Sequence, residues 1–329
     1  MEPLGLSISS RGGFAPQQFA EYAQLAEERG FAAVFATENY SDALALAQAM
    51  AAATRRIAVG TAITNVYLRH PVLAALTAAT IDELSGGRFL LGLGAVSSTF
   101  NEGVLGLRAE PPLRRTREYV AVVRAVLSGE PITYQGEVFQ VAEFRAYRRP
   151  PRPDLPIYLG ALQPRMLALA GEVADGVLLA LSTPEQAHTA VERVRAQAES
   201  VGRDPARLRV ACVLPSAVTN DVAAARRTAR ELVVDYARHP ATRQRFANAG
   251  YADEMACIAA ALAAGNRSAA LASVGDAMAE ALVLHGAPQD CQARVAAFRA
   301  VGVELPILFP IPIDGDWDAS IRAALTAFG

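Results

Sequence analysis

Short apolar runs and longer amphipathic stretches alternate along the whole of this chain. The apolar runs have the length of β-strands and predict eight of them, at residues 4–9, 31–37, 57–63, 89–93, 157–161, 176–180, 209–218 and 305–309. Between them, apolar residues recur every three or four positions, and proline opens many of these stretches, which predicts helices. The helices are expected at residues 16–30, 42–53, 71–84, 112–127, 164–172, 184–201, 288–300 and 318–328.

This alternation predicts an α/β protein with a (β/α)8 TIM barrel that occupies residues 1–329 as a single domain. Two segments interrupt the rhythm. Residues 129–149 predict a hairpin insertion after the fourth helix, and residues 220–285 predict an almost wholly helical insertion after the seventh strand. A doubly wound open sheet is the rival fold. It would usually carry a G-x-G-x-x-G turn after the first strand, whereas residues 9–14 here read S-S-R-G-G-F.

Two neighbouring strands end in small residues, Gly60-Thr61-Ala62 in the third and Gly92-Leu93-Gly94 in the fourth. In a barrel these ends lie at the same mouth. A single glycine is also typical of a tight turn, but two adjacent strands with this feature favour a flat ligand that fills the vacated space. The sequence therefore predicts a ligand beside these strand ends.

Composition narrows the functional classes. Apolar residues make up 52% of the 329, and the formal net charge is -2, so neither nucleic acid nor an anionic membrane is an expected partner. No apolar run has the length of a membrane span and residues 1–9 do not resemble a secretory signal, which favours a cytoplasmic protein. The three cysteines show no metal-binding spacing, and no metal is expected.

The chain contains 31 arginines and no lysine. This excludes Schiff-base chemistry, a pyridoxal phosphate anchor and a P-loop lysine. Any phosphate bound here must therefore be held by arginine side chains, hydroxyl groups or backbone N–H groups.

Three blocks of sequence resemble the bacterial luciferase-like superfamily, and most closely its coenzyme F420-dependent, methylenetetrahydromethanopterin-reductase-like branch. The blocks are G-T-A-I-T-N at 60–65 with R-H-P at 69–71, D-E-L-S-G-G-R at 82–88 with G-L-G at 92–94, and P-I-Y-L-G-A at 156–161 with P-R-M at 164–166 and A-D-G at 174–176. They occur in order and cover nearly the whole chain. The resemblance implies a flavin-type ring at the carboxyl-terminal mouth of the barrel, and a cis peptide bond between Ala62 and Ile63 that faces it.

The resemblance also implies which residues contact the cofactor. Those expected around the ring are Ser7, Thr37, Glu38, Asn39, Thr61, Ala62, Ile63, Thr64, Gly94 and Ala95. Those expected around its phosphate are Gly160, Ala161, Leu162, Gln163, Arg165 and Met166. Free N–H groups and the positive end of a helix dipole make the second segment attractive to an anion.

The chain departs from its relatives where acid–base chemistry is expected. Relatives often carry Asp-His at the end of the second strand, and this chain carries Glu38-Asn39. An asparagine amide cannot exchange a proton near neutral pH. Relatives often place Gly-Glu after the fourth strand, where this chain has A-V-S-S-T and then Glu102. Glu38, Asn39 and Glu102 are thus the catalytic candidates, although Glu38 could instead pair with a barrel arginine.

Three functions remain open at this level. The overall likeness favours an F420-dependent oxidoreductase that transfers a hydride between the deazaflavin C5 and a carbonyl, imine or alkene carbon of a small organic substrate. The first alternative is an FMN-dependent luciferase-like monooxygenase, and the second is a non-catalytic flavin-binding barrel. A homodimer is expected, with the alanine-rich helices 42–53 and 71–84 as contact surfaces.

Overall fold

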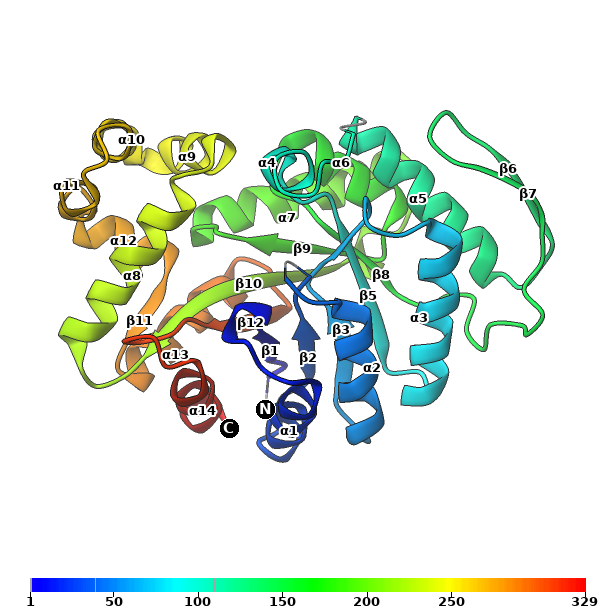
Figure 1. Cartoon of the computed structure of the whole chain (residues 1–329), viewed down its shortest axis with the longest axis horizontal. Helices are drawn as coiled ribbons and strands as arrows, with labels where there is room; N and C mark the ends of the chain where they lie inside the picture. The colour runs from blue at the N-terminus through cyan, green and yellow to red at the C-terminus, as the bar shows by residue number, and fades with distance from the viewer. Residues whose placement is uncertain (1, 39, 109–110) are drawn as a thin grey trace.

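Eight parallel strands close into a barrel in the computed structural model, which describes residues 2–38, 40–108 and 111–329 (Figure 1). The barrel strands are β1 (Gly5–Ile8), β2 (Ala33–Ala36), β3 (Ala58–Thr61), β5 (Phe89–Gly94), β8 (Ile157–Gly160), β9 (Gly176–Ala180), β10 (Arg209–Val218) and β12 (Leu305–Pro310). The first and last strands pair in parallel, with Gly5 opposite Ile307, and this pairing closes the cylinder. The predicted (β/α)8 barrel is confirmed. The assignment of the whole chain to one domain stays a prediction.

A helix follows most of the strands and packs outside the barrel. These helices are α1 (Pro16–Glu28), α2 (Ala43–Ala53), α3 (Pro71–Ser85), α5 (Pro112–Leu127), α6 (Pro164–Val173), α7 (Pro184–Ser200), α13 (Pro288–Ala300) and α14 (Trp317–Phe328). Proline occupies the first turn of six of them, where its missing N–H removes no hydrogen bond. The sequence therefore placed these helix starts correctly.

Bulky apolar side chains fill the barrel interior. Phe35, Leu178 and Ile307 are buried there, and Tyr158 and Leu90 pack against them. The barrel is thus a packed core rather than a pore, so a ligand can lie only at one of its ends. A second, larger layer of apolar residues lies between the strands and the surrounding helices.

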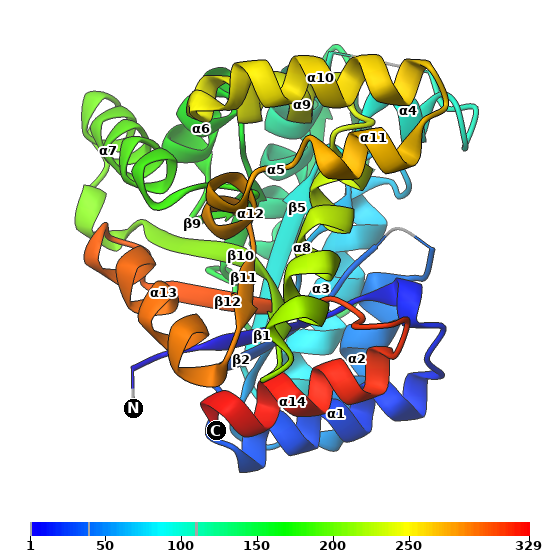
Figure 2. The ribbon, with the colours of Figure 1, turned by 90° about the vertical axis from the view of Figure 1, so that its left-hand side faces the viewer.

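Both predicted insertions are present. The hairpin consists of the antiparallel strands β6 (Ile132–Gln135) and β7 (Gln140–Phe144), which lie at the right edge of Figure 1 beyond α5. The helical insertion comprises α8 (Val222–Tyr236), α9 (Pro240–Phe246), the π-helical η3 (Ala247–Tyr251), α10 (Ala252–Ala263), α11 (Arg267–Ala272) and α12 (Asp276–Leu282). Figure 2 shows α9, α10 and α11 gathered at the top of that view, beyond one end of α8.

Several short elements differ from the prediction. The strand β11 (Leu284–Gly286) replaces the expected end of the helical insertion, because these residues pair in parallel with residues 216–218 of β10, beyond the part of β10 that pairs with β9. The sequence also did not predict β4 (Thr64–Asn65), α4 (Ser98–Asn101), η1 (Ser10–Gly12) or η2 (Pro205–Arg207). Within the described residues, none of the helices combines the length and apolar character that crossing a membrane requires.

Candidate active site at the barrel mouth

Ile63 forms the centre of the carboxyl-terminal mouth of the barrel. The peptide bond between Ala62 and Ile63 is cis, as the resemblance implies. A Cβ atom at Gly94 would lie only 2.8 Å from the Ile63 Cδ1 atom, and one at Gly160 would lie 3.2 Å from Cγ2. Glycine at the ends of β5 and β8 therefore makes room for the Ile63 side chain, which spans both strands.

The other two glycines of this region do not border empty space. A Cβ atom at Gly60 would lie 2.7 Å from the carbonyl oxygen of Leu90 and 2.8 Å from the ring of Phe35. At Gly92 it would lie 1.8 Å from the carbonyl oxygen of Thr61. Protein atoms therefore fill the space beside Gly60 and Gly92, and the ligand predicted beside these strand ends stays a prediction for the surface above them.

An open apolar surface lies above this packed layer. Inward-facing residues at the strand ends remain half-buried, in contrast to the buried interior below them. They include Ala62, Ile63, Gly160, Ala180 and Phe309. A surface of this kind offers a planar aromatic ring an apolar face to lie on.

Ser7 supplies a polar group beside this surface. It pairs in register with Phe35, so its side chain points to the inner face of the barrel. The Ser7 hydroxyl is fully buried and has no hydrogen-bond partner in the described part of the chain. Buried hydroxyls are normally satisfied, so this one marks a position where a bound molecule could accept or donate a hydrogen bond. The residues at the mouth therefore fit a flavin-type ring.

Glu38, just after β2, is fixed by two short hydrogen bonds. Its Oε2 accepts one from the backbone N–H of Asn65 at 2.5 Å, and its Oε1 accepts one from Arg69 at 2.5 Å. Arg69 also contacts Asp42 at 2.5 Å. Burial opposes the charge of Arg69, but the hydrogen bond and charge of Glu38, together with Asp42, outweigh it and raise the Arg69 pKa. The geometry supports the arginine-partner role of Glu38 over a role in proton transfer.

A pair of buried asparagines links the end of β4 to α4, the short helix that follows β5. The Asn65 amide donates to Asn101 Oδ1 at 2.8 Å and accepts from the backbone N–H of Tyr67 at 3.1 Å. Asn101 in turn donates to the carbonyl of Val96 at 3.0 Å. Both asparagines are almost fully buried, so this network fixes the segment that follows β5 to the rim of the mouth. Sequence reasoning did not select Asn101, and only its contact with Asn65 reveals it.

The three predicted threonines use their hydroxyls in different ways. Thr37 Oγ1 accepts from the backbone N–H of Ser10 at 3.1 Å, and this bond connects the turns after β1 and β2. Thr61 both donates to the Gly92 carbonyl at 2.8 Å and accepts from its N–H at 3.1 Å. Thr64 pairs in register with Leu93, which packs in the layer behind the barrel, so Thr64 points away from the mouth, and its buried hydroxyl has no hydrogen-bond partner among the described residues. All three hydroxyls are thus directed into the protein framework.

The predicted phosphate segment forms the turn from β8 into α6. The backbone N–H of Ala161 donates to the Leu178 carbonyl at 3.1 Å, while Met166 packs against the core layer. Gln163 is the N-cap residue of α6, and its side chain and that of Arg165 are exposed. This arrangement leaves two long polar side chains next to the first turn of a helix.

The remaining catalytic candidates contribute less to this picture. Glu102 is exposed at the carboxyl end of α4. Asn39 lies outside the described residues. Of the two candidates that the structure describes, only Glu38 belongs to a defined network at the mouth.

The whole barrel, including its mouth, resembles a known protein family. The family described as luciferase-like monooxygenase matches residues 4–305. The chain belongs to this luciferase-like family. The membership expected from the three sequence blocks is confirmed.

Individual relatives of this luciferase-like protein agree with the expected branch. The chain is 36% identical to a 5,10-methylenetetrahydromethanopterin reductase of Methanolobus tindarius, across 87% of this chain and 88% of the relative. It is 31% identical to the protein of that name from Archaeoglobus fulgidus, across 92% and 91%. The solved coenzyme F420-dependent tetrahydromethanopterin reductase of Methanopyrus kandleri superposes with a TM-score of 0.84 at 26% identity, covering 99% of this chain and 98% of that one.

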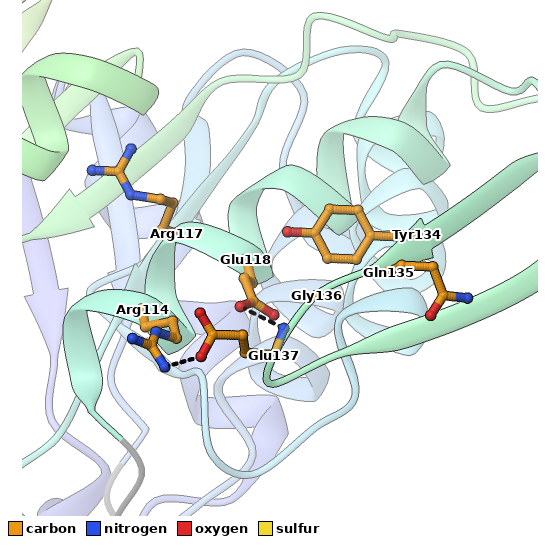
Figure 3. Close-up of a pocket in the computed structure, with 7 residues that line it drawn as sticks. All are labelled: Arg114, Arg117, Glu118, Tyr134, Gln135, Gly136 and Glu137. Atoms are coloured by element: carbon orange, nitrogen blue, oxygen red, sulfur yellow. Dashed lines mark hydrogen bonds and ion pairs between the residues drawn. The ribbon is translucent and has the colours of Figure 1, made fainter.

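A hollow of about 580 Å³ lies away from the mouth of the luciferase-like barrel, between α5 and the β6–β7 hairpin (Figure 3). Its charged residues are engaged in structural contacts. Arg114 pairs with Glu137, and Arg117 pairs with Glu172 of α6. Glu118 accepts hydrogen bonds from three consecutive backbone N–H groups at residues 137–139, which fixes the tip of the hairpin. We therefore interpret this hollow as a result of the contacts that hold the hairpin and α6 against α5.

Proposed function

We propose that this luciferase-like protein is a coenzyme F420-dependent oxidoreductase. Bound at the barrel mouth, the deazaflavin would exchange a hydride at C5 with a carbonyl, imine or alkene carbon of a small organic substrate. The observation that carries the proposal is the open apolar surface around Ile63, with the unsatisfied Ser7 hydroxyl beside it. The solved reductase that covers 99% of this chain is named as coenzyme F420-dependent, and this supports the choice of F420.

The chain's own residues would bind and orient the reactants. Ile63 would support one face of the ring, since it lies across the ends of β5 and β8. Ser7 would hydrogen-bond to the ring edge, and Gln163 and Arg165 would contact the anionic tail. The carboxylate of Glu38 is held between Asn65 and Arg69. Catalysis would therefore depend mainly on orientation at the mouth.

Equilibrium titration of the purified protein with F420 and with FMN tests this proposal. We expect F420 to bind, with a change in its absorbance and fluorescence, and FMN to bind at least tenfold more weakly (about 1.4 kcal/mol). Binding of FMN without F420 would favour the monooxygenase alternative. Binding of neither would favour a barrel without a flavin-type cofactor and would overturn the proposal.

Two matched variants locate the site. Ala62→Trp places a large side chain on the half-buried inner surface at the end of β3, and Ala206→Trp places one on the exposed turn η2, before the start of β10. The first substitution should abolish F420 binding and the second should leave it unchanged. Equal affinities for the two variants would contradict the location at the mouth.

The proposal also includes a homodimer and a cytoplasmic location. Leu73 and Leu84 lie three helical turns apart on α3 and are 55% and 48% exposed. An apolar stripe of this kind supports contact with a second copy through α2 and α3. Light scattering coupled to size-exclusion chromatography should give twice the 34.7 kDa chain mass, and Leu73→Glu should give the monomer mass.

A further inference from the structure

A single side chain, Arg245, connects the helical insertion to the barrel mouth at two neighbouring turns. Arg245 lies in α9, and its Nε donates to the Leu181 carbonyl at 3.0 Å. One terminal nitrogen donates to the Leu162 carbonyl at 2.7 Å, and the other donates to the Ser182 hydroxyl at 2.5 Å. Leu162 follows β8, whereas Leu181 and Ser182 follow β9. The planar guanidinium therefore holds both turns in one geometry.

Among the described residues, none compensates the charge of Arg245 through an ion pair. Its three acceptors are two carbonyls and a hydroxyl, and no carboxylate of the described residues forms an ion pair with it. Burial lowers the pKa of Arg245 below its ordinary value. A partly buried charge that has only neutral partners is stabilised by a nearby anion, because attraction between charges is stronger away from water.

Groups that attract an anion lie next to this charge. Leu162, which accepts a hydrogen bond from Arg245, lies two residues before α6, and the exposed Gln163 and Arg165 flank the first turn of that helix. The first amides of a helix lack acceptors within the helix and attract negative charge. Arg245 thus holds the turn from behind, while the exposed side chains and the helix end face outward.

We propose that Arg245 is a positioning residue for the anionic tail of the cofactor. It fixes the turns after β8 and β9 and places a positive charge behind the segment from Gly160 to Met166. This inference rests on the proposed function. It predicts that Arg245 contributes to recognition of the tail and contributes nothing to recognition of the ring.

The test compares two ligands in the same protein: F420, and the same deazaflavin riboside without its phosphate-bearing tail. Arg245→Gln should weaken F420 binding about tenfold or more and leave the affinity for the tail-less compound within about twofold. Arg245→Lys keeps the charge and should recover part of the loss. Arg243→Gln is the matched control, because Arg243 lies in the same helix and donates only to the carbonyls of Ala237 and Arg238.

The ratio of the two dissociation constants is the decisive readout, since a merely structural role would not change it. An unchanged ratio in Arg245→Gln, with or without a lower melting temperature, would overturn the inference while the proposed function stood. If wild-type protein prefers FMN, the same comparison with FMN and riboflavin tests the inference after the F420 proposal has failed. If the wild type binds neither pair, both are overturned. If Arg245→Gln does not fold, Arg245→Lys carries the comparison.

Discussion

Replacement of Glu38 by glutamine exchanges one carboxylate oxygen for an NH2 group and should destabilise the protein strongly. The Glu38 side chain is only 3% exposed, and both of its oxygens accept hydrogen bonds at 2.5 Å, from Asn65 and from Arg69. Glutamine can still accept a hydrogen bond from Asn65, but it carries no charge to pair with Arg69. The variant therefore isolates the ionic part of the interaction.

The contacts of Arg69 set the size of the effect. Removal of one partner from a buried ion pair costs about 3–5 kcal/mol. Arg69 is 17% exposed and keeps its contact with Asp42, so we expect a smaller loss of about 2–3 kcal/mol for Glu38→Gln. Asp42→Asn is the control. Asp42 contacts the same arginine but is 50% exposed, and asparagine can replace it as the N-cap residue of α2. The loss of stability in Asp42→Asn should therefore stay below about 1 kcal/mol.

Urea denaturation followed by circular dichroism measures both variants. In an Arg69→Met background, Glu38→Gln should cost clearly less than in the wild type, because the charge it paired with is gone. Equal losses for Glu38→Gln and Asp42→Asn would refute the assignment of Glu38 as a buried ionic partner. So would a Glu38→Gln protein that is as stable as the wild type but has lost turnover, since that result identifies a catalytic carboxylate.

Three further predictions concern other positions. Gly92→Ala would place a methyl group 1.8 Å from a carbonyl oxygen and should cost about 3 kcal/mol or more in thermal melts, whereas Gly275→Ala, with its nearest atom at 4.0 Å, should be nearly neutral. Burial raises the Glu118 pKa, but three N–H donors outweigh it and hold the pKa below its ordinary 4.5. Glu118 therefore stabilises the fold above pH 4.5 and loses this contribution as the pH falls through the folded-state value. Glu118→Gln should thus cost about 1–3 kcal/mol at pH 7 and progressively less as the pH is lowered below 4.5 in urea denaturation, and a loss that does not change with pH would contradict this sign. Asn101→Leu should break the bond to Asn65 and speed amide hydrogen exchange over residues 97–101, and unchanged exchange would show that the asparagine pair does not hold this segment.

Local patterns predicted most of the fold. The bounds of β9, β10, α5 and α13 agree with the sequence-based ranges, since apolar periodicity and an opening proline act within a few residues of the chain. The strand β11 was not predicted, because its three residues form a strand only through their pairing with β10. A three-residue segment carries too little local signal to compete with its helical surroundings.

The candidate site was less accessible to sequence reasoning. The sequence located the mouth and the residues around Ile63, and it raised the possibility that Glu38 pairs with an arginine. It predicted a ligand in the space beside Gly60 and Gly92, and protein atoms fill that space. A sequence shows that a side chain is small, but it does not show which atoms approach it. It also gave no sign of Arg245, whose partners lie 63 to 83 positions away.

The sequence by itself determined the order of strands and helices, the absence of lysine chemistry and the location of the open strand ends. These properties depend on residue type and on spacing along the chain. The tertiary structure alone decided that Ile63 covers Gly94 and Gly160, that Glu38 is held between Asn65 and Arg69, and that Arg245 joins two turns of the mouth. Such contacts form only when barrel closure brings separate strand ends together, and short-range forces then select which side chains meet.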